Sequence, residues 1–168
     1  VKAGSITFKG NKQDSKGKVA LLWNASKAIL GKHIPCLRQE IGDCVSMGGA
    51  NVCDYLQCVE LLAGDFSEYH HASTMYIYSV SRQIIGKGRI GDRSDGSVGV
   101  WAAEGMTKYG IVAADNPLMP PYSGAEARKW GARGYPQQWA IDEGKLNLIQ
   151  TYSAVKTYAD VRDAICNG

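Results

Sequence analysis

The feature that most constrains the fold is a helix-like segment, residues 44–63, which follows a polar stretch broken by glycine. Its apolar residues recur at steps of seven, four, three and four, which places them on one stripe of a helix. They are Val45, Val52, Leu56, Val59 and Ala63. Asp43 stands where an N-cap belongs, and Gly64 supplies a stop. We therefore predict a long helix that begins at Cys44 and buries this stripe.

Cys44 is the residue in this segment whose position has a chemical consequence. In the first turn of a helix, unpaired backbone N–H groups and the helix dipole favour a thiolate, which is the nucleophilic form of cysteine. Gln39 lies five residues upstream, and its amide can donate to a developing oxyanion beside the backbone N–H of Cys44. This combination predicts a nucleophile with an oxyanion hole. The alternative is that Cys44 is a small buried hydrophobe, as cysteines in apolar helices usually are.

Composition excludes several classes of protein. The chain has 168 residues and is 45% hydrophobic, enough for one domain with a substantial core. The net charge of +3 is spread without a basic block, so we expect no nucleic-acid partner. No apolar run approaches the roughly 18 residues that span a bilayer, so we expect a soluble protein with no membrane partner. The compartment stays open, and a virus particle or a secreted location is compatible with the sequence.

Cysteine and histidine spacing predicts no metal site and no cofactor. The chain has five cysteines, an odd number, and no C-x-x-C pair, so at least one thiol stays unpaired and the disulfide pairing is open. The adjacent His70 and His71 point to different sides, and the sequence places no further ligands with them. His33 is the histidine nearest to Cys44 in sequence, but an exposed loop histidine is the commoner state there. The glycine-rich residues 86–97 match no phosphate-binding fingerprint.

The remaining pattern divides the chain at residue 32. Residues 1–32 read as an N-terminal extension with a weak strand and a docking helix over 19–30, which Gly31 ends. Residues 33–168 form the main domain. Its other predicted elements are helices at 72–85, 98–109 and 125–130, a turn at 137–143, a strand or extended connector at 146–155, and a helix at 161–166 capped by Asp160.

The order of these landmarks resembles the papain-like cysteine peptidases, in the divergent form of bacteria and phages. The matching segments are Gln39 with Gly42-Asp43-Cys44, then Ser94-Asp95-Gly96-Ser97 before Trp101-Ala102-Ala103, then Tyr109-Gly110-Ile111, Pro120-Pro121-Tyr122 and residues 160–168. The resemblance covers roughly residues 33–168. It implies an α+β papain-like fold of which this chain holds mainly the helical half, with the central helix starting at Cys44 and the barrel half largely absent.

The resemblance also implies roles for individual residues. Cys44 would be the nucleophile that attacks a peptide bond, and Gln39 would form the oxyanion hole. The segment Asp95, Gly96 and Ser97 would bind the peptide or protein substrate. Two features depart from the family pattern. Gln39 is one residue nearer the cysteine than is usual, and Cys44 is flanked by Asp and Val-Ser-Met where the family commonly has Ser and Trp-Ala-Phe.

The general base is missing from this pattern. In the family, a histidine and the Asn or Asp that orients it come from the barrel half, and this chain ends where that half would begin. None of its three histidines matches that position. We therefore expect the base to come from a second polypeptide or a further C-terminal part. The alternatives are a catalytically inactive papain-like structural or interaction protein in a larger assembly such as a virus particle, and a small-molecule thiol transferase.

Overall fold

The computed structural model describes residues 21–64, 68–149, 152 and 154–167, and these form seven α-helices and one π-helical segment. The helices are α1 (Leu22–Leu30), α2 (Cys44–Leu62), α3 (Thr74–Ser79), which continues as the π-helix η1 (Val80–Ile85), α4 (Gly99–Tyr109), α5 (Gly124–Trp130), α6 (Gln138–Gly144) and α7 (Tyr158–Asn167). Within the described residues the only β pairing is an isolated antiparallel bridge between Ala72 and Ala113. The helical part of the predicted fold class is therefore confirmed, and no strand accompanies it there.

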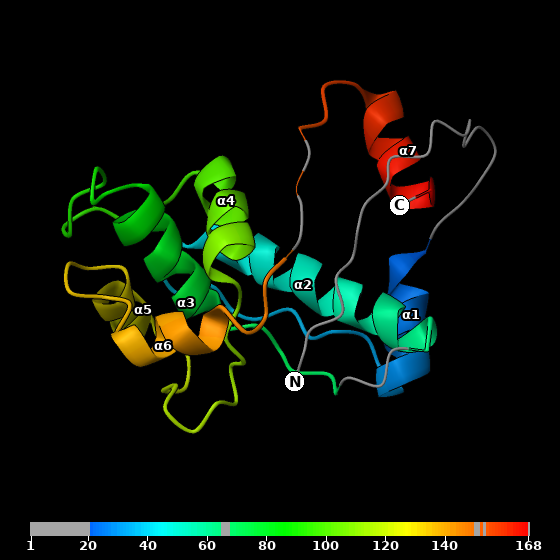
Figure 1. Cartoon of the computed structure of the whole chain (residues 1–168), viewed down its shortest axis with the longest axis horizontal. Coiled ribbons are helices and arrows are strands. Elements are labelled where there is room, and N and C mark those ends of the chain that lie inside the picture. Colours follow the sequence, from blue (N-terminus) through cyan, green and yellow to red (C-terminus); the bar gives the residue numbers. More distant parts are fainter. Residues whose placement is uncertain (1–20, 65–67, 150–151, 153, 168) are drawn as a thin grey trace.

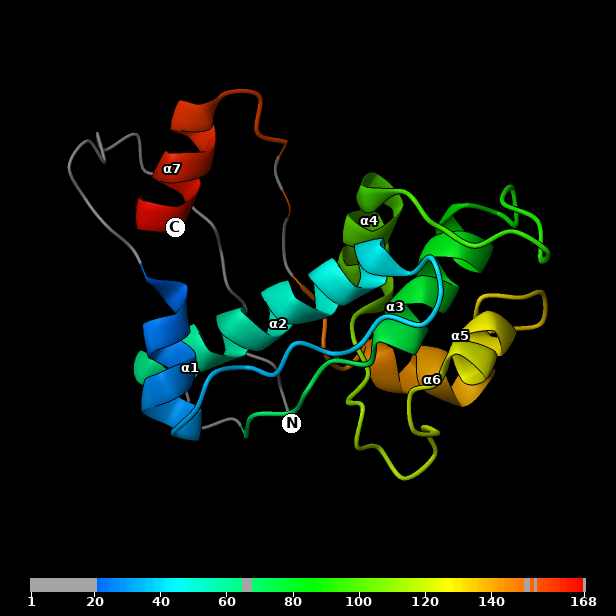
Figure 2. The same ribbon diagram turned by 180° about the vertical axis from the view of Figure 1, so that it is seen from behind.

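Helix α2 extends from α1 to the group of helices that contains α3 and α4 (Figures 1 and 2). It packs against α1 at its C-terminal end and also contacts α3 and α4. Helix α1 thus docks on the main body as predicted, and it ends at Gly31, which has a left-handed φ of 68°. None of the helices in the described part of the chain is both long enough and apolar enough to cross a membrane.

The predicted start of α2 at Cys44 is confirmed, but the predicted buried stripe is wrong. Val52 is 55% exposed and Val59 is 39% exposed. The side that is buried carries Ser46, Ala50, Cys53, Asp54 and Cys58. These side chains are small, so neighbouring helices approach α2 closely on that side and leave the larger valines outside.

The main core lies around α3, whose six residues are all buried. Tyr76 and Tyr78 belong to a cluster with Val112, Trp130 and other apolar residues from η1, α5 and α6. The Tyr76 hydroxyl donates to the carbonyl of Tyr109 at 2.7 Å, so its polar end is satisfied inside the core. The helix predicted over residues 72–85 is confirmed as α3 with η1.

Two predictions concern the C-terminal end. The described residues of the range 146–155 contain no strand, so the strand alternative is wrong there and these residues form a connector. The connector makes two backbone bonds near the end of α4: the carbonyl of Asn147 accepts from the N–H of Ile111 at 3.0 Å, and the N–H of Ile149 donates to the carbonyl of Met106 at 3.1 Å. Asp160 does not cap its helix from outside. It lies in the first turn of α7 and accepts from the N–H of Thr157 at 2.9 Å, while the Thr157 hydroxyl accepts from the N–H of Asp160 at 3.1 Å. The weak strand predicted near the N-terminus lies outside the described residues.

Candidate functional site

Cys44 is the first residue of α2, and it is exposed. This excludes the alternative in which it is a buried core residue. Cys36 is exposed as well, whereas Cys53 and Cys58 are buried. Burial raises the pKa of Cys53 to about 12, so that thiol is protonated at neutral pH. Of the cysteines on α2, only Cys44 therefore has a thiol that a solvent-borne reactant can reach.

Gln39 lies in the loop before α2, and its side chain is partly committed to the loop itself. Its Nε2 donates to the carbonyl of Ile41 at 2.6 Å. This bond folds the loop back toward the turn that leads into Cys44, and the amide keeps a second N–H. No hydrogen bond joins Gln39 to Cys44 among the described residues, so the predicted oxyanion role of Gln39 stays a prediction.

The predicted substrate segment does lie against the turn before Cys44. The N–H of Gly42 donates to Oδ2 of Asp95 at 3.3 Å across 53 positions of sequence. A Cβ added to Gly42 would lie 2.8 Å from the Cβ of Asp95, so glycine is required for this approach. Arg128 reaches the same Asp95 oxygen from α5 at 3.5 Å. Three separated segments therefore meet at the start of α2.

Gly96 and Ser97, by contrast, use their polar groups inside the protein. The N–H of Gly96 donates to the Tyr78 hydroxyl at 3.0 Å, and its carbonyl accepts from Nη1 of Arg82 at 2.6 Å. The hydroxyls of Ser97 and Ser81 are hydrogen-bonded to each other. In this arrangement Gly96 offers no open N–H to a peptide, although its nitrogen lies close to the Gly42 turn. Of the predicted binding residues, Asp95 makes the hydrogen bond to that turn.

A buried arginine that the sequence analysis missed holds this loop. Arg82 lies in η1 and is 2% exposed. Its guanidinium donates to the carbonyls of Ile90, Gly91, Ser94, Gly96 and Gly131, at 2.6 to 3.3 Å. It also lies 4.9 Å from the centre of the Tyr78 ring. An arginine in a helix rich in apolar residues, just before a glycine-rich loop, is the sequence signal that points to this clamp.

A second missed network fixes the other side of the turn. Asp43 is fully buried, and its Oδ2 accepts from the Tyr122 hydroxyl at 3.0 Å, while its Oδ1 has no hydrogen-bond partner. The Tyr122 oxygen also accepts from the N–H of Glu40 at 3.2 Å, and Glu40 accepts from the N–H of Gly124 at 2.8 Å. Asp43 does occupy the N-cap position of α2, as predicted, but its side chain makes no capping bond to the helix.

Burial changes the proton affinity of Asp43. Loss of hydration raises the pKa of its carboxyl group, and the hydrogen bond from Tyr122 opposes this shift. The nearby negative charge of Asp95 acts in the same direction as burial. The residue just before Cys44 is thus an acid that resists ionisation.

His71 lies beside Asp54 in the middle of α2, and not beside Cys44 at its start. Nδ1 of His71 is hydrogen-bonded to Oδ2 of buried Asp54, and Oδ1 of Asp54 accepts from the N–H of Ala72 at 2.9 Å. The hydrogen bond to Asp54 raises the pKa of His71. Asp54 is ten positions beyond Cys44, which at 1.5 Å per residue is about 15 Å along the helix. His71 is therefore no base for Cys44 in this structure.

The other histidines lie away from the thiol as well. His70 is half-buried, with its Nδ1 3.3 Å from Oδ2 of Asp115, and His33 is exposed. No hydrogen bond joins either ring to Cys44 in the part of the chain that the structure describes. The same residues contain no group of three or more His, Cys, Asp or Glu side chains able to hold a metal ion.

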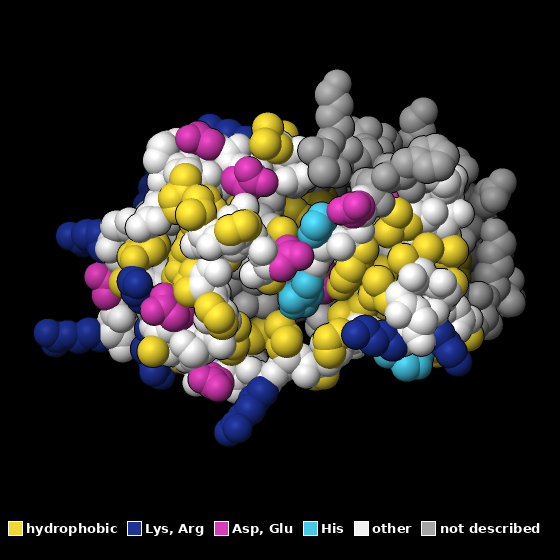
Figure 3. All heavy atoms as spheres, turned by 90° about the horizontal axis from the view of Figure 1, so that it is seen from below, with side chains coloured by type: hydrophobic (Ala, Val, Ile, Leu, Met, Phe, Trp, Pro, Cys, Tyr) yellow, Lys and Arg dark blue, Asp and Glu magenta, His cyan; other side chains and the backbone are white. Residues whose placement is uncertain are grey.

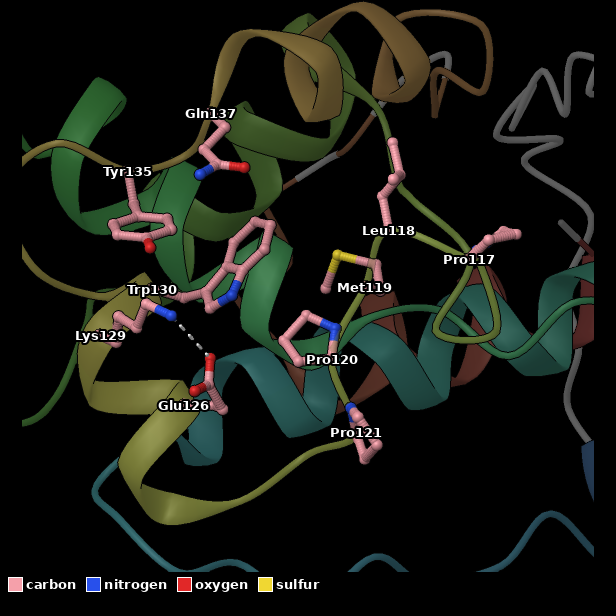
Figure 4. Close-up of a pocket in the computed structure, with 10 residues that line it drawn as sticks. All are labelled: Pro117, Leu118, Met119, Pro120, Pro121, Glu126, Lys129, Trp130, Tyr135 and Gln137. Atoms are coloured by element: carbon pink, nitrogen blue, oxygen red, sulfur yellow. Dashed lines mark hydrogen bonds and ion pairs between the residues drawn. The ribbon is translucent and has the colours of Figure 1, made fainter.

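A pocket of about 480 Å³ lies behind the segment that leads to Tyr122. Figure 4 shows Met119 and Pro120 turned toward Trp130, with Tyr135 and Gln137 on the opposite side. Trp130 packs on Tyr135 with ring centres 5.3 Å apart. The pocket wall combines apolar and aromatic side chains with the polar side chains of Glu126, Lys129 and Gln137, and it supports the loop that carries Tyr122.

Comparison with known proteins identifies no relative of this chain. No family model, no curated protein and no solved structure matches the chain. Its function has to be inferred from the residues around Cys44.

Proposed function

We propose that this chain is the nucleophile-bearing helical half of a papain-like cysteine peptidase. The observation that carries the proposal is an exposed thiol on the first residue of the 19-residue helix α2. The turn before it is held from two sides, by Asp95 and by Tyr122. A rigid turn with an exposed cysteine at a helix N-terminus is the arrangement that thiol catalysis requires.

The chemistry would begin with attack of the Cys44 thiolate on the carbonyl carbon of a peptide bond. A sulfur–carbon bond forms, and the carbonyl electron pair moves to oxygen. The backbone N–H of Cys44 and the second N–H of Gln39 then donate to that oxyanion. The carbon–nitrogen bond breaks as a general acid protonates the leaving amine, and water hydrolyses the resulting thioester and restores the thiol.

The imidazole that takes and returns the proton would come from a second polypeptide or from a further part of the protein. None of the described histidines contacts Cys44, and His71 is engaged with Asp54. The proposal therefore includes a partner that carries a histidine and an orienting Asn or Asp. That partner would cover the thiol side of the Cys44 turn.

A catalytically inactive structural or interaction protein in a larger assembly is the second candidate. It is favoured by Gly96, whose N–H and carbonyl are both used within the protein. In that case the interactions around the turn would serve packing alone. The exposed thiol would then have no special reactivity.

Alkylation by iodoacetamide tests the proposal, because Cys36 provides a matched exposed thiol outside any helix. The intact chain is treated at neutral pH, and modification of each cysteine is followed by mass spectrometry of its peptides. Cys44 is expected to react faster than Cys36, since the first turn of α2 stabilises negative charge on its sulfur. Equal rates would refute an activated nucleophile.

A peptide aldehyde separates the enzyme from the inactive scaffold. Such an aldehyde forms a reversible hemithioacetal with a catalytic thiol, and its oxygen occupies the oxyanion hole. The peptidase predicts that the aldehyde protects Cys44 but not Cys36 from alkylation, and that Gln39→Ala weakens this protection. Absence of protection favours the scaffold.

A further inference from the structure

Exposed basic residues gather on the loop after η1, on α5 and on the loop after α5, and this group is called here the cationic patch. Its members are Lys87, Arg89 and Arg93 after η1, Arg128 and Lys129 in α5, and Arg133 just beyond α5. Figure 3 shows Lys and Arg side chains gathering on the left of the view. All six residues are exposed, so their charges face solvent.

The two loops of the cationic patch are joined by one buried side chain. The Arg82 guanidinium donates to carbonyls of the first loop and, through Nε, to the carbonyl of Gly131 in the second loop at 3.0 Å. The N–H of Arg133 also donates to Oδ1 of Asp92 at 3.2 Å. The basic side chains therefore stand on a scaffold whose two parts are fixed relative to each other, which lowers the entropy lost on binding.

The acidic residues within the cationic patch leave it with excess positive charge. They are Asp92, Asp95 and Glu126, against six basic residues. Arg128 pairs with Asp95 and Lys129 with Glu126, each at 3.5 Å. Among the described residues no ion pair reaches the side chains of the other four basic residues.

We propose that the cationic patch binds acidic peptide segments and thereby selects acidic substrates for the Cys44 site. Guanidinium groups bind carboxylates in a two-pronged geometry, and four of the six members are arginines. The patch extends to the candidate site, because Arg128 contacts Asp95 and Asp95 holds Gly42, two residues before Cys44. The substrate part of this inference rests on the proposed peptidase function, and the peptide-binding part does not.

An acidic peptide fits the cationic patch better than a nucleic acid does. A nucleic-acid duplex carries one phosphate charge per about 1.7 Å, and carboxylates spread through the patch would repel that dense charge. Single strands need open aromatic faces for base stacking. Tyr135 lies beside the patch, but the Lys129 ammonium stands 5.9 Å from its ring centre, and Trp130 packs on it.

Fluorescence anisotropy with a labelled oligoglutamate peptide tests the inference. The protein carries Cys44→Ser, so binding is measured without any reaction. We expect binding that weakens as salt is raised from about 50 mM to about 200 mM, because the contacts are exposed charge pairs. The double variant Arg89→Glu, Arg93→Glu should weaken binding at least about tenfold.

The matched control is the double variant Lys32→Glu, Lys145→Glu, at two exposed positions outside the cationic patch. It changes the net charge by the same amount as Arg89→Glu, Arg93→Glu does. It should leave binding within about twofold, because neither lysine belongs to the cationic patch and salt screens exposed charges from one another. Equal losses in both double variants, or no binding by the unsubstituted patch, would overturn the inference. Tighter binding of an oligothymidylate than of oligoglutamate would overturn it too, by assigning the surface to nucleic acid.

The alkylation experiment keeps this inference distinct from the proposed function. Patch-dependent peptide binding together with equal reactivity of Cys44 and Cys36 supports an acidic-peptide binder and refutes the peptidase. A reactive, aldehyde-protected Cys44 without peptide binding at the cationic patch supports the peptidase and refutes the patch.

Discussion

Replacing Arg82 by lysine would remove a guanidinium that supplies hydrogen bonds to five backbone carbonyls in the interior. An ammonium group has three donors on one atom, so at least two of the five hydrogen bonds from residue 82 are lost. A hydrogen bond to a charged group contributes about 1.5 to 3 kcal/mol, so the loss is about 3 to 6 kcal/mol. Domains of this size are stable by only about 5 to 15 kcal/mol, and the effect is therefore large.

Urea unfolding followed by circular dichroism measures this loss in Arg82→Lys. Limited trypsin digestion adds a local measure, because the clamped loop contains Lys87, Arg89 and Arg93 as cleavage sites. We expect faster cleavage at these residues in the variant at urea concentrations where the chain is still folded. Arg133→Lys is the matched control, since Arg133 is exposed and its replacement should change stability by less than about 0.5 kcal/mol.

Two results would refute the account of Arg82. One is an unfolding free energy for Arg82→Lys that lies within about 0.5 kcal/mol of the original chain. The other is an unchanged cleavage rate in the loop despite a large loss of global stability. The second result would mean that the guanidinium stabilises the core without positioning the loop.

Three further predictions concern the turn before Cys44 and the buried acids. Gly42→Ala places a Cβ 2.8 Å from the Cβ of Asp95, and the displacement should cost about 1 to 3 kcal/mol in urea unfolding. Because the pKa of His71 is raised, its pairing with Asp54 stabilises the fold fully below about pH 6.5, and this stabilisation is lost as pH rises through the folded-state pKa. In His71→Gln the free energy of unfolding should no longer fall over that pH range. The pKa of Asp43 is also raised, but by burial and not by a partner, so the native state binds the proton more tightly than the unfolded chain does. Stability therefore falls as pH rises from about 3.8 through the folded-state pKa, and Asp43→Asn should remove this fall.

Matched measurements control these three variants. Gly48→Ala introduces a methyl group into α2 where no atom lies within 4 Å, and helix propensity should then raise stability by about 0.5 to 1 kcal/mol. If Gly42→Ala raises the free energy of unfolding as Gly48→Ala does, then Asp95 leaves room for the added methyl group and the predicted clash is wrong. For the two titrating groups, an unfolding free energy whose pH dependence is unchanged in His71→Gln or Asp43→Asn would contradict the assignment of that slope.

Local signals in the sequence were enough to place most helices. Gly31 ends α1, Gly42 and Asp43 precede α2, and Gly110 follows α4, as the sequence predicts. These signals work at short range because a helix end depends on the conformation and hydrogen bonds of a few neighbouring residues. The position of Cys44 at the start of α2 was predictable for the same reason, whereas its exposure was not.

Long-range contacts decide the rest, and no local pattern contains them. The larger apolar residues of α2 suggested the wrong buried side, because the small side chains that other helices can approach most closely form the interface. The side chain of Asp43 faces Tyr122 across 79 positions instead of bonding to α2, and Gly42 meets Asp95 across 53. The charge of Arg82 is tolerated inside the protein only because carbonyls from two distant loops converge on it. The sequence shows which of these residues are polar or small, but their contact partners are determined by how the distant segments pack in the folded chain.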